Sequence, residues 1–344
     1  MVILLAALSL VILYSLNLNQ ANPDFFKFKR QLLSVGIGFV CLLIFLLIDY
    51  RFVEDYAYLF YFISLLLLIL VLFFGTNLRG TTGWFILGPI SFQPIELAKI
   101  FLLLSLAKFF EKRTADFKNI ALSGIMIGLP SVLLLLQPDT GYVILSVIWW
   151  LGFLITAGMQ KKYLILIVIL MIVSAACAWL FFLHNYQKER ILVFLQPQRD
   201  ILGSGYNIQQ SIIAVGSGKL AGQGLGIGPQ SRLNFLPEQD TDFIFSVISE
   251  EMGFLGASFT LGLLAFLIFK ILAQAKNSVD NFEKLLLTGI GFFLLTQTSI
   301  NIAMVIGLAP VIGIPLPFLS YGGNSLISNL IIIGLVESIL IHRP

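Results

Sequence analysis

The chain of 344 residues is 58% hydrophobic and only 11% charged, with a formal net charge of +3 and a mean hydropathy of +0.96. Soluble domains usually carry about a quarter charged residues, so this composition excludes an ordinary soluble enzyme and favours a membrane protein. Its 2 histidines leave almost no material for a Ser-His-Asp triad or a histidine metal cluster. Cys41 and Cys177 both lie in apolar runs, where we expect no disulfide framework. Any catalysis must therefore use carboxylates and cations.

Apolar runs long enough to cross roughly 30 Å of hydrocarbon recur along the whole chain. We predict about ten membrane helices, at residues 2–16, 32–48, 56–74, 94–110, 120–136, 142–157, 163–183, 243–272, 285–308 and 317–341. The first run lacks a preceding basic residue and a convincing cleavage site, which favours a true helix over a signal peptide. The sequence therefore predicts an all-α polytopic membrane protein with a single domain over residues 1–344.

The basic residues are distributed unequally between the two sides of these predicted helices. An even number of spans places both termini on one side, and loops on that side would carry Arg51, Lys108, Lys112, Arg113, Lys118, Lys161, Lys162, Lys270, Lys276, Lys284 and Arg343. The short loops on the other side carry Lys27, Lys29, Arg30 and Arg79. By the positive-inside rule, both termini are expected in the cytoplasm.

One long polar segment, at about residues 184–241, is predicted on the outer side, and loops of that length usually carry function. Within it, residues 206–215 are typical of a short amphipathic helix. The glycines of 216–228 suggest tight turns. A nucleotide fingerprint is disfavoured there because no strand precedes the glycines, and nothing else predicts a nucleotide or nucleic-acid ligand.

Ionisable groups inside a membrane helix or at its mouth are functional candidates, and the first such place is Phe92-Gln-Pro-Ile-Glu-Leu-Ala-Lys99. Pro94 suits the first turn of a helix, and Glu96 and Lys99 lie three residues apart on one face. The two are expected to pair. The pair has two open interpretations: it anchors the helix, or Lys99 offers its charge to an anionic lipid headgroup.

Two further acidic places flank predicted helices on the outer side. In Gln137-Pro-Asp-Thr-Gly141, Asp139 either caps the next helix or lines an active cleft. Glu238, Asp240 and Asp242 are concentrated before another helix, where capping explains one carboxylate but not three. The adjacent Glu250 and Glu251 lie deeper in that helix, so we predict a polar cavity that reaches them.

The fourth place is residues 313–325, where prolines and paired glycines interrupt an otherwise apolar run. Non-helical backbone at membrane depth is tolerated only inside protein or beside a water-filled cavity. This segment, with Ser320 as a candidate substrate contact, is therefore expected to line the same site.

These four segments, in this order, together with Gly205-Tyr-Asn-Ile-Gln-Gln-Ser211, resemble the SEDS family (shape, elongation, division and sporulation proteins) from residue 80 to residue 334. Gly313-Ile-Pro-Leu-Pro-Phe318 is similar to the RodA form of the family, which serves cell elongation, more than to the FtsW form, which serves division.

The resemblance implies a glycosyltransferase that polymerises lipid II on the outer face of the bacterial cytoplasmic membrane, together with a class B penicillin-binding protein that cross-links the glycan. It implies that Asp242 is the catalytic aspartate and that Glu96, Lys99 and Asp139 occupy motif positions. Glu238 and Ser320 are further candidates for binding substrate. Lys99, Arg232 or a divalent cation are candidates to meet the charge of the leaving pyrophosphate.

The sequence departs from the family pattern beside the catalytic position. Histidine is common before the Thr241-Asp242 pair, whereas this chain has Asp240. A second carboxylate so close would favour the protonated form of Asp242 by like-charge repulsion.

Two other classes of function fit the membrane character of the chain. A lipid-precursor flippase would also have many spans and intramembrane charges, but it has no need of acids concentrated at one membrane face. A scaffold for cell-wall enzymes would tolerate neutralisation of those acids.

Overall fold

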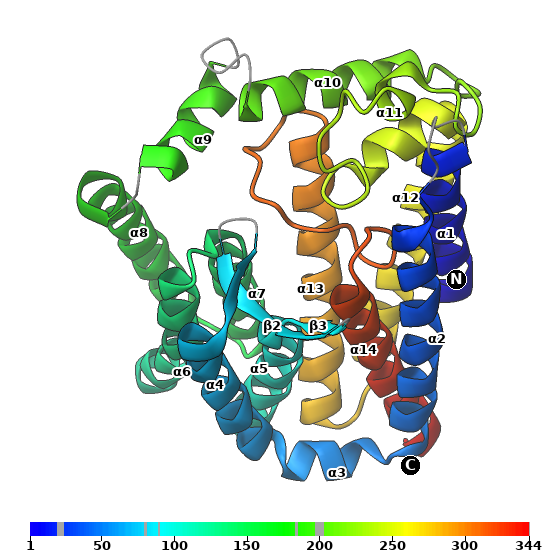
Figure 1. The fold of residues 1–344 in the computed structure, drawn as a ribbon. Helices are drawn as coiled ribbons and strands as arrows, with labels where there is room; N and C mark the ends of the chain where they lie inside the picture. Colours follow the sequence, from blue (N-terminus) through cyan, green and yellow to red (C-terminus); the bar gives the residue numbers. More distant parts are fainter. Residues whose placement is uncertain (19–23, 79–80, 89, 183–184, 197–202, 344) are drawn as a thin grey trace.

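The computed structural model describes residues 1–18, 24–78, 81–88, 90–182, 185–196 and 203–343. Arg79, His184 and part of the predicted long loop, residues 197–202, lie outside the described residues. The chain forms a helical bundle in which α10 and α11 lie across one end and α3 lies across the opposite end (Figure 1). We call these the α10 end and the α3 end.

The helices that the structure describes follow one another in this order: α1 (Val2–Leu18), α2 (Phe26–Leu47), α3 (Tyr50–Asp55), α4 (Ala57–Phe74), α5 (Pro94–Phe110), α6 (Phe117–Leu136), α7 (Thr140–Thr156), α8 (Lys161–Cys177), the π-helical turn η1 (Ala178–Phe182), α9 (Asn185–Leu195), α10 (Ser204–Ser217), α11 (Pro229–Arg232), α12 (Ile244–Lys276), α13 (Asn281–Val305) and α14 (Gly323–His342). The all-α prediction is confirmed. The amphipathic helix predicted at 206–215 corresponds to α10, and the predicted long loop also contains α9 and α11.

The number of membrane spans is only partly settled by helix length. Within the described residues, 7 helices are long and apolar enough to cross a membrane. The other three predicted spans correspond to α1, α5 and α7, each of 17 residues. At a rise of about 1.5 Å per residue such helices are near the lower limit for crossing, so the count of ten stays a prediction.

A small antiparallel sheet, which the sequence did not predict, connects α4 to α5. Its strands are β1 (Thr76–Leu78), β2 (Thr81–Leu87) and β3 (Ile90–Phe92), in the order β1-β2-β3. Ser91 on β3 accepts a hydrogen bond from Arg30 of α2 at 2.6 Å, and its carbonyl accepts one from Asn324 of α14 at 2.8 Å. The sheet therefore links α4 and α5 to α2 and α14.

Helix α12 is broken at Gly253, whose backbone (φ 65°, ψ −164°) is not helical. The freed groups pair with the glycine-rich segment: the carbonyls of Glu250 and Glu251 accept from the N–H groups of Gln223 and Gly224 at 2.9 and 3.0 Å. A Cβ on Gly222 would lie 2.1 Å from the Glu251 carbonyl, so only glycine permits this approach. The glycines of this segment therefore allow its backbone to pack directly against the break in α12.

The side chains of Glu250 and Glu251 hold the same segment. Glu250 accepts from the N–H groups of Gln230 and Ser231 at 2.8 and 3.0 Å, at the start of α11. Glu251 accepts from Ser15 at 2.6 Å and from the N–H of Gly226 at 3.0 Å. Both carboxylates are buried and have protein hydrogen-bond donors as partners, and the predicted polar cavity stays a prediction.

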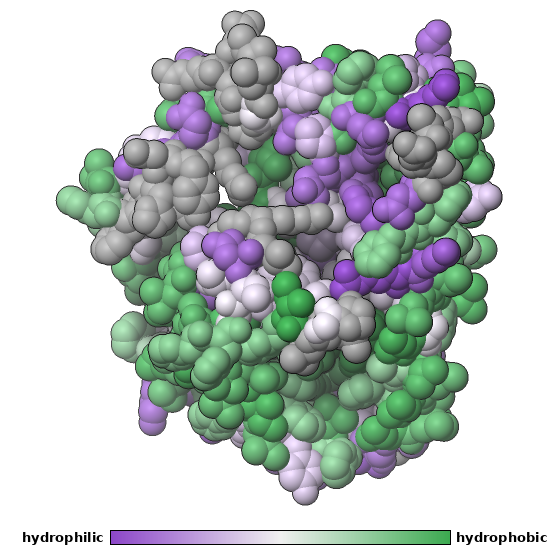
Figure 2. All heavy atoms as spheres, viewed as in Figure 1, coloured by the Kyte–Doolittle hydropathy of each residue, from purple (hydrophilic) through white to green (hydrophobic). Residues whose placement is uncertain are grey.

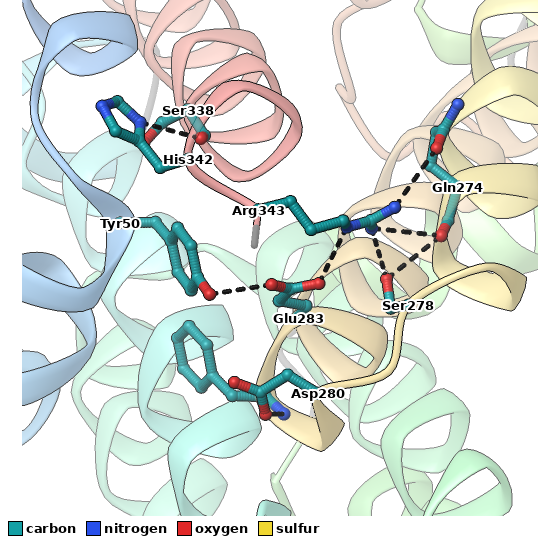
Figure 3. Close-up of polar contacts among 9 residues, drawn as sticks. Tyr50, Gln274, Ser278, Asp280, Glu283, Ser338, His342 and Arg343 are labelled. Carbon is teal, nitrogen blue, oxygen red and sulfur yellow. Dashed lines mark hydrogen bonds and ion pairs between the residues drawn. The ribbon is translucent and has the colours of Figure 1, made fainter.

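A polar cluster at the α3 end joins four helices (Figure 3). Glu283 on α13 accepts from the Tyr50 hydroxyl at 2.7 Å and pairs with Arg343, just after α14, at 3.0 Å. Arg343 also donates to Ser278, just after α12, at 2.6 Å. Burial, followed by the hydrogen bond to Glu283, raises the pKa of Tyr50 to about 12. Its hydroxyl therefore stays a donor throughout the physiological range.

We expect Arg343→Met to lower the thermal unfolding midpoint of the purified protein, because it leaves the nearly buried Glu283 carboxylate without its cation. Breaking a buried pair costs about 3–5 kcal/mol, and the 21% exposure of the arginine side chain reduces this to about 2–3 kcal/mol. Lys284→Met, at an exposed neighbouring position, is the control. Equal midpoints for the two variants would show that the pair contributes nothing.

Candidate active site

The segment 240–242, just before α12, is held through its backbone. The carbonyl of Asp240 accepts from the N–H of Tyr321 at 2.7 Å, and that of Thr241 accepts from the Ser320 hydroxyl at 2.6 Å. The carbonyl of Asp242 accepts from the Asn301 side chain of α13 at 2.9 Å. Three successive peptide groups are therefore fixed by α13 and by the 313–325 segment.

The 313–325 segment begins with extended and turned backbone, as predicted, and α14 starts only at Gly323. Asn301 also donates to the carbonyl of Ile314 at 2.7 Å, and Gln297 donates to that of Pro315 at 2.9 Å. Both amides are fully buried on α13. Helix α13 therefore holds both the non-helical backbone of residues 314–315 and the carbonyl of Asp242.

The Asp242 side chain is partly exposed and lies against Gly313 of this segment. A Cβ on Gly313 would lie 3.4 Å from its Oδ2 atom, and Gly313 has a φ of +77°. A Cβ on Gly141, at the start of α7, would lie 3.1 Å from the carbonyl of Ile312. The start of α7 and Asp242, just before α12, therefore both lie close to residues 312–314.

Glu96 and Lys99 form the predicted ion pair on α5, and both are buried. Glu96 also accepts from the hydroxyls of Tyr142 on α7, at 2.5 Å, and Ser328 on α14, at 2.7 Å. The Lys99 ammonium lies 5.0 Å from the centre of the Phe293 ring. Lys99 is therefore enclosed by protein, and its contact with a substrate stays a prediction.

Asp139 is the N-cap of α7 and accepts from the N–H of Tyr142 at 3.4 Å. The capping interpretation is thus confirmed, whereas its role toward substrate stays a prediction. Burial raises the pKa of Asp139 to about 6, against the weaker opposing effect of its hydrogen bond to Tyr142. Tyr142 donates its hydroxyl to Glu96 and its N–H to Asp139, so it connects the buried pair to the cap of α7.

The raised pKa of Asp139 predicts a pH-dependent stability. The pKa of Asp139 in the folded protein lies above the ordinary 3.8. Its favourable contribution to the free energy of unfolding is therefore complete below pH 4 and is lost as the pH rises through about 6. Asparagine caps a helix equally well and cannot ionise. We therefore expect the free energy of unfolding of Asp139→Asn to rise relative to that of wild type as the pH goes from 4.5 to 7.5. After allowance for the partial exposure of Asp139, the expected rise is about 1–2 kcal/mol.

The measurement for Asp139 is the difference in thermal midpoint between variant and wild type at the two pH values. A difference that stays constant between pH 4.5 and 7.5 would contradict the assignment of this titration to Asp139.

The remaining predicted residues lie in different surroundings. Arg232 is exposed at the end of α11 and forms no ion pair with a residue that the structure describes. Glu238 is exposed, has a φ of +53°, and accepts from the Thr241 hydroxyl at 2.9 Å. Ser320 is buried and donates to the Thr241 carbonyl, so it positions the segment.

Sequence reasoning missed several residues that organise this site: Tyr142, Ser328, Asn301, Gln297 and Gln31. Gln31 on α2 is fully buried and donates to the carbonyl of Ser320 at 3.2 Å. Four of them are polar side chains in apolar predicted spans, a signal that could have nominated them, whereas Gln31 lies just before the predicted span 32–48.

The surface around this region differs from the rest of the molecule. Figure 2 shows hydrophilic side chains gathered around a hollow toward the α10 end, whereas the lower half of the same face is mainly hydrophobic. In the described part of the chain, no group of three or more His, Cys, Asp and Glu residues is arranged to hold a metal ion. A divalent cation bound here would therefore need ligands from the substrate as well as from a carboxylate.

Comparisons with known proteins show the family of the chain. The family model for the cell cycle proteins FtsW, RodA and SpoVE matches residues 1–344. The peptidoglycan glycosyltransferase MrdB of Escherichia coli strain K12 is 36% identical over 343 residues, which cover 99% of this chain and 93% of that protein. MrdB of Helicobacter pylori strain 26695 is 36% identical over 326 residues, covering 91% and 83%.

Two solved structures share the fold. A chain of a peptidoglycan synthase complex, studied for the coordination of polymerization and crosslinking, matches with a TM-score of 0.85 and 33% identity over 100% of this chain and 98% of that one. The rod shape determining protein RodA of Thermus thermophilus matches with a TM-score of 0.74 and 30% identity, covering 99% and 95%. The chain therefore belongs to the family of FtsW, RodA and SpoVE, the SEDS proteins that its motifs resemble.

Proposed function

We propose that this protein is a peptidoglycan glycosyltransferase of the RodA type, which polymerises lipid II into β-1,4-linked glycan during cell elongation. The observation that carries this proposal is the Asp242 carboxylate, partly exposed at a site whose backbone is fixed by Tyr321, Ser320 and Asn301. The curated relatives MrdB have this activity in their names.

The reaction needs one general base. Lipid II carries an α-linked sugar pyrophosphate and the product is β-linked, so a single inverting displacement is sufficient. Asp242 accepts the proton of the acceptor 4-hydroxyl as its oxygen attacks C1 of the donor sugar. The C1–O bond breaks, and undecaprenyl pyrophosphate leaves with both electrons of that bond.

The charge that develops on the leaving group must be met by cations. Arg232 is exposed at the α10 end and is our first candidate. Lys99 is enclosed by protein in this structure, so it can meet the pyrophosphate only if its side chain leaves its present contacts when lipid II binds. A divalent cation at the pyrophosphate would supply positive charge and would be held mainly by phosphate oxygens, because the described residues offer no group of three or more His, Cys, Asp and Glu to hold one.

The proposed orientation places the α10 end outside the cytoplasmic membrane and the α3 end in the cytoplasm. Arg51, Lys112 and Lys276 lie near the α3 end, which supports this orientation by the positive-inside rule.

We expect a reporter placed in residues 217–228 to react only from outside the cell, and one after Lys276 only from inside. Reversed labelling would place Asp242 on the wrong face for wall synthesis.

The decisive experiment uses purified protein and lipid II in detergent, alone and with a class B penicillin-binding protein, which we propose as the partner. We expect glycan chains of increasing length on gels. A flippase has nothing to transport in detergent, so the absence of polymer from a well-folded preparation would favour that class of protein.

A further inference from the structure

Two charged residues at the mouth of the site have no role in the proposed chemistry. Asp240 lies two residues before Asp242, and its side chain is 8% exposed. Its carboxylate pairs with the Lys27 ammonium, on the first turn of α2, at 2.7 Å. The lysine side chain is 51% exposed, so this ion pair joins a buried acid to a cation at the surface.

The contacts around the pair restrict where Asp240 can move. Its carbonyl is held by the N–H of Tyr321 at 2.7 Å, and the Lys27 ammonium lies 6.0 Å from the centre of the Tyr321 ring. Four residues along α2, Gln31 contacts the same turn through the carbonyl of Ser320 and the N–H of Gly322. One face of α2 therefore supports both the side chain of Asp240 and the turn that fixes its backbone.

The ion pair also changes the charge close to Asp242. Charged and titratable groups around the segment include Lys27 on α2, Tyr142 on α7, Tyr321 before α14, and Glu238 and Asp240 in the segment itself. A carboxylate two residues from a general base repels the negative charge that the base needs. An ammonium 2.7 Å from that carboxylate opposes this repulsion.

We propose that Lys27 is a positioning residue for the polymerisation reaction: through its ion pair with Asp240 it fixes the 240–242 segment against α2 and offsets the charge of the extra acid beside Asp242. This inference rests on the proposed function. It assigns Lys27 no contact with the reacting atoms.

The test compares Lys27→Met with the double variant Lys27→Met/Asp240→Asn in lipid II polymerisation. For Lys27→Met we expect kcat to fall about tenfold with little change in KM, and the acid side of the pH–rate profile to move up by about half to one pH unit. The double variant removes the uncompensated acid, so kcat should return to within about threefold of wild type. Lys27→Arg, which keeps the charge, should retain the wild-type rate and profile.

The control is Lys29→Met, at an exposed position on the same turn, with thermal stability measured for every variant. A wild-type rate for Lys27→Met would overturn the proposal. So would a raised KM that the second substitution does not correct, because that result assigns Lys27 to direct binding of the anionic substrate. If Lys27→Met folds poorly, the double variant decides. A double variant that folds normally but does not recover activity also overturns the proposal.

Asp242→Asn in the same assay separates this inference from the proposed function. If wild type makes no glycan, the proposed function fails. If Asp242→Asn makes as much glycan as wild type, Asp242 is not the general base, and the offset of charge beside it loses its purpose. If Asp242→Asn is inactive while Lys27→Met is normal, only the role of Lys27 fails.

Discussion

We expect Asp242→Asn to reduce glycan polymerisation from lipid II by about 10²–10⁴-fold, the usual effect of removing a general base. Asparagine preserves the size of the side chain, and the carbonyl of residue 242 still accepts from Asn301. The backbone contacts that hold the segment are therefore unaffected. The loss should appear in kcat, with the thermal midpoint and lipid II binding little changed.

Asp116→Asn is the matched control for this substitution. Asp116 caps α6 by accepting from the N–H of Asn119 at 3.0 Å, a role that asparagine can fill, and it lies outside the site. Both variants are assayed with the purified penicillin-binding partner present. Wild-type polymerisation by Asp242→Asn would show that Asp242 is not the general base.

The sequence located the parts of this site because each breaks the rule that membrane helices are apolar. Glu96 and Lys99 were expected to pair, and they do. The prolines and glycines of 313–325 predicted a break in the helical run, and α14 begins only at Gly323. Such signals are local, so a single sequence is sufficient to find them.

The connections between these parts depend on tertiary contacts that no local pattern contains. Glu250 and Glu251 were expected to need partners or water, but nothing in the sequence indicates that the partners are Gly226, Gln230 and Ser231, which turn back onto α12. The partner of Asp240 is more than two hundred residues away on α2. Spacing along one helix can predict an i,i+3 pair such as Glu96–Lys99, but not these contacts.

The small sheet was missed for a related reason. Residues 76–92 connect two predicted membrane helices, and their apolar character was assigned to the adjoining spans or to a loop. The threonines and aromatic residues of β2 suit a strand, and Gly88, with a φ of +62°, makes the turn toward β3. Strands of three to seven residues give weak signals beside helices of about twenty.

The second large effect is expected at the Glu96–Lys99 pair. Lys99→Met leaves the Glu96 carboxylate buried without a cation, with only the hydroxyls of Tyr142 and Ser328 as donors. Removing one partner of a buried pair costs about 3–5 kcal/mol, which we expect as a large fall in thermal midpoint and in the yield of folded protein. Removing both charges, in Glu96→Gln/Lys99→Met, should cost far less, because glutamine still accepts from Tyr142 or Ser328 and methionine packs against Phe293.

Activity of this double variant decides between the two interpretations of Lys99. The ammonium is enclosed by Glu96 and the Phe293 ring, so we expect the double variant to recover polymerisation to within about tenfold of wild type together with folding. That result would assign the pair to holding α5 against α7 and α14, and through Tyr142 to the surroundings of Asp242. A double variant that folds normally and binds its partner but makes no glycan would contradict this expectation. It would place Lys99 at the pyrophosphate, which requires the side chain to leave its present contacts when lipid II binds.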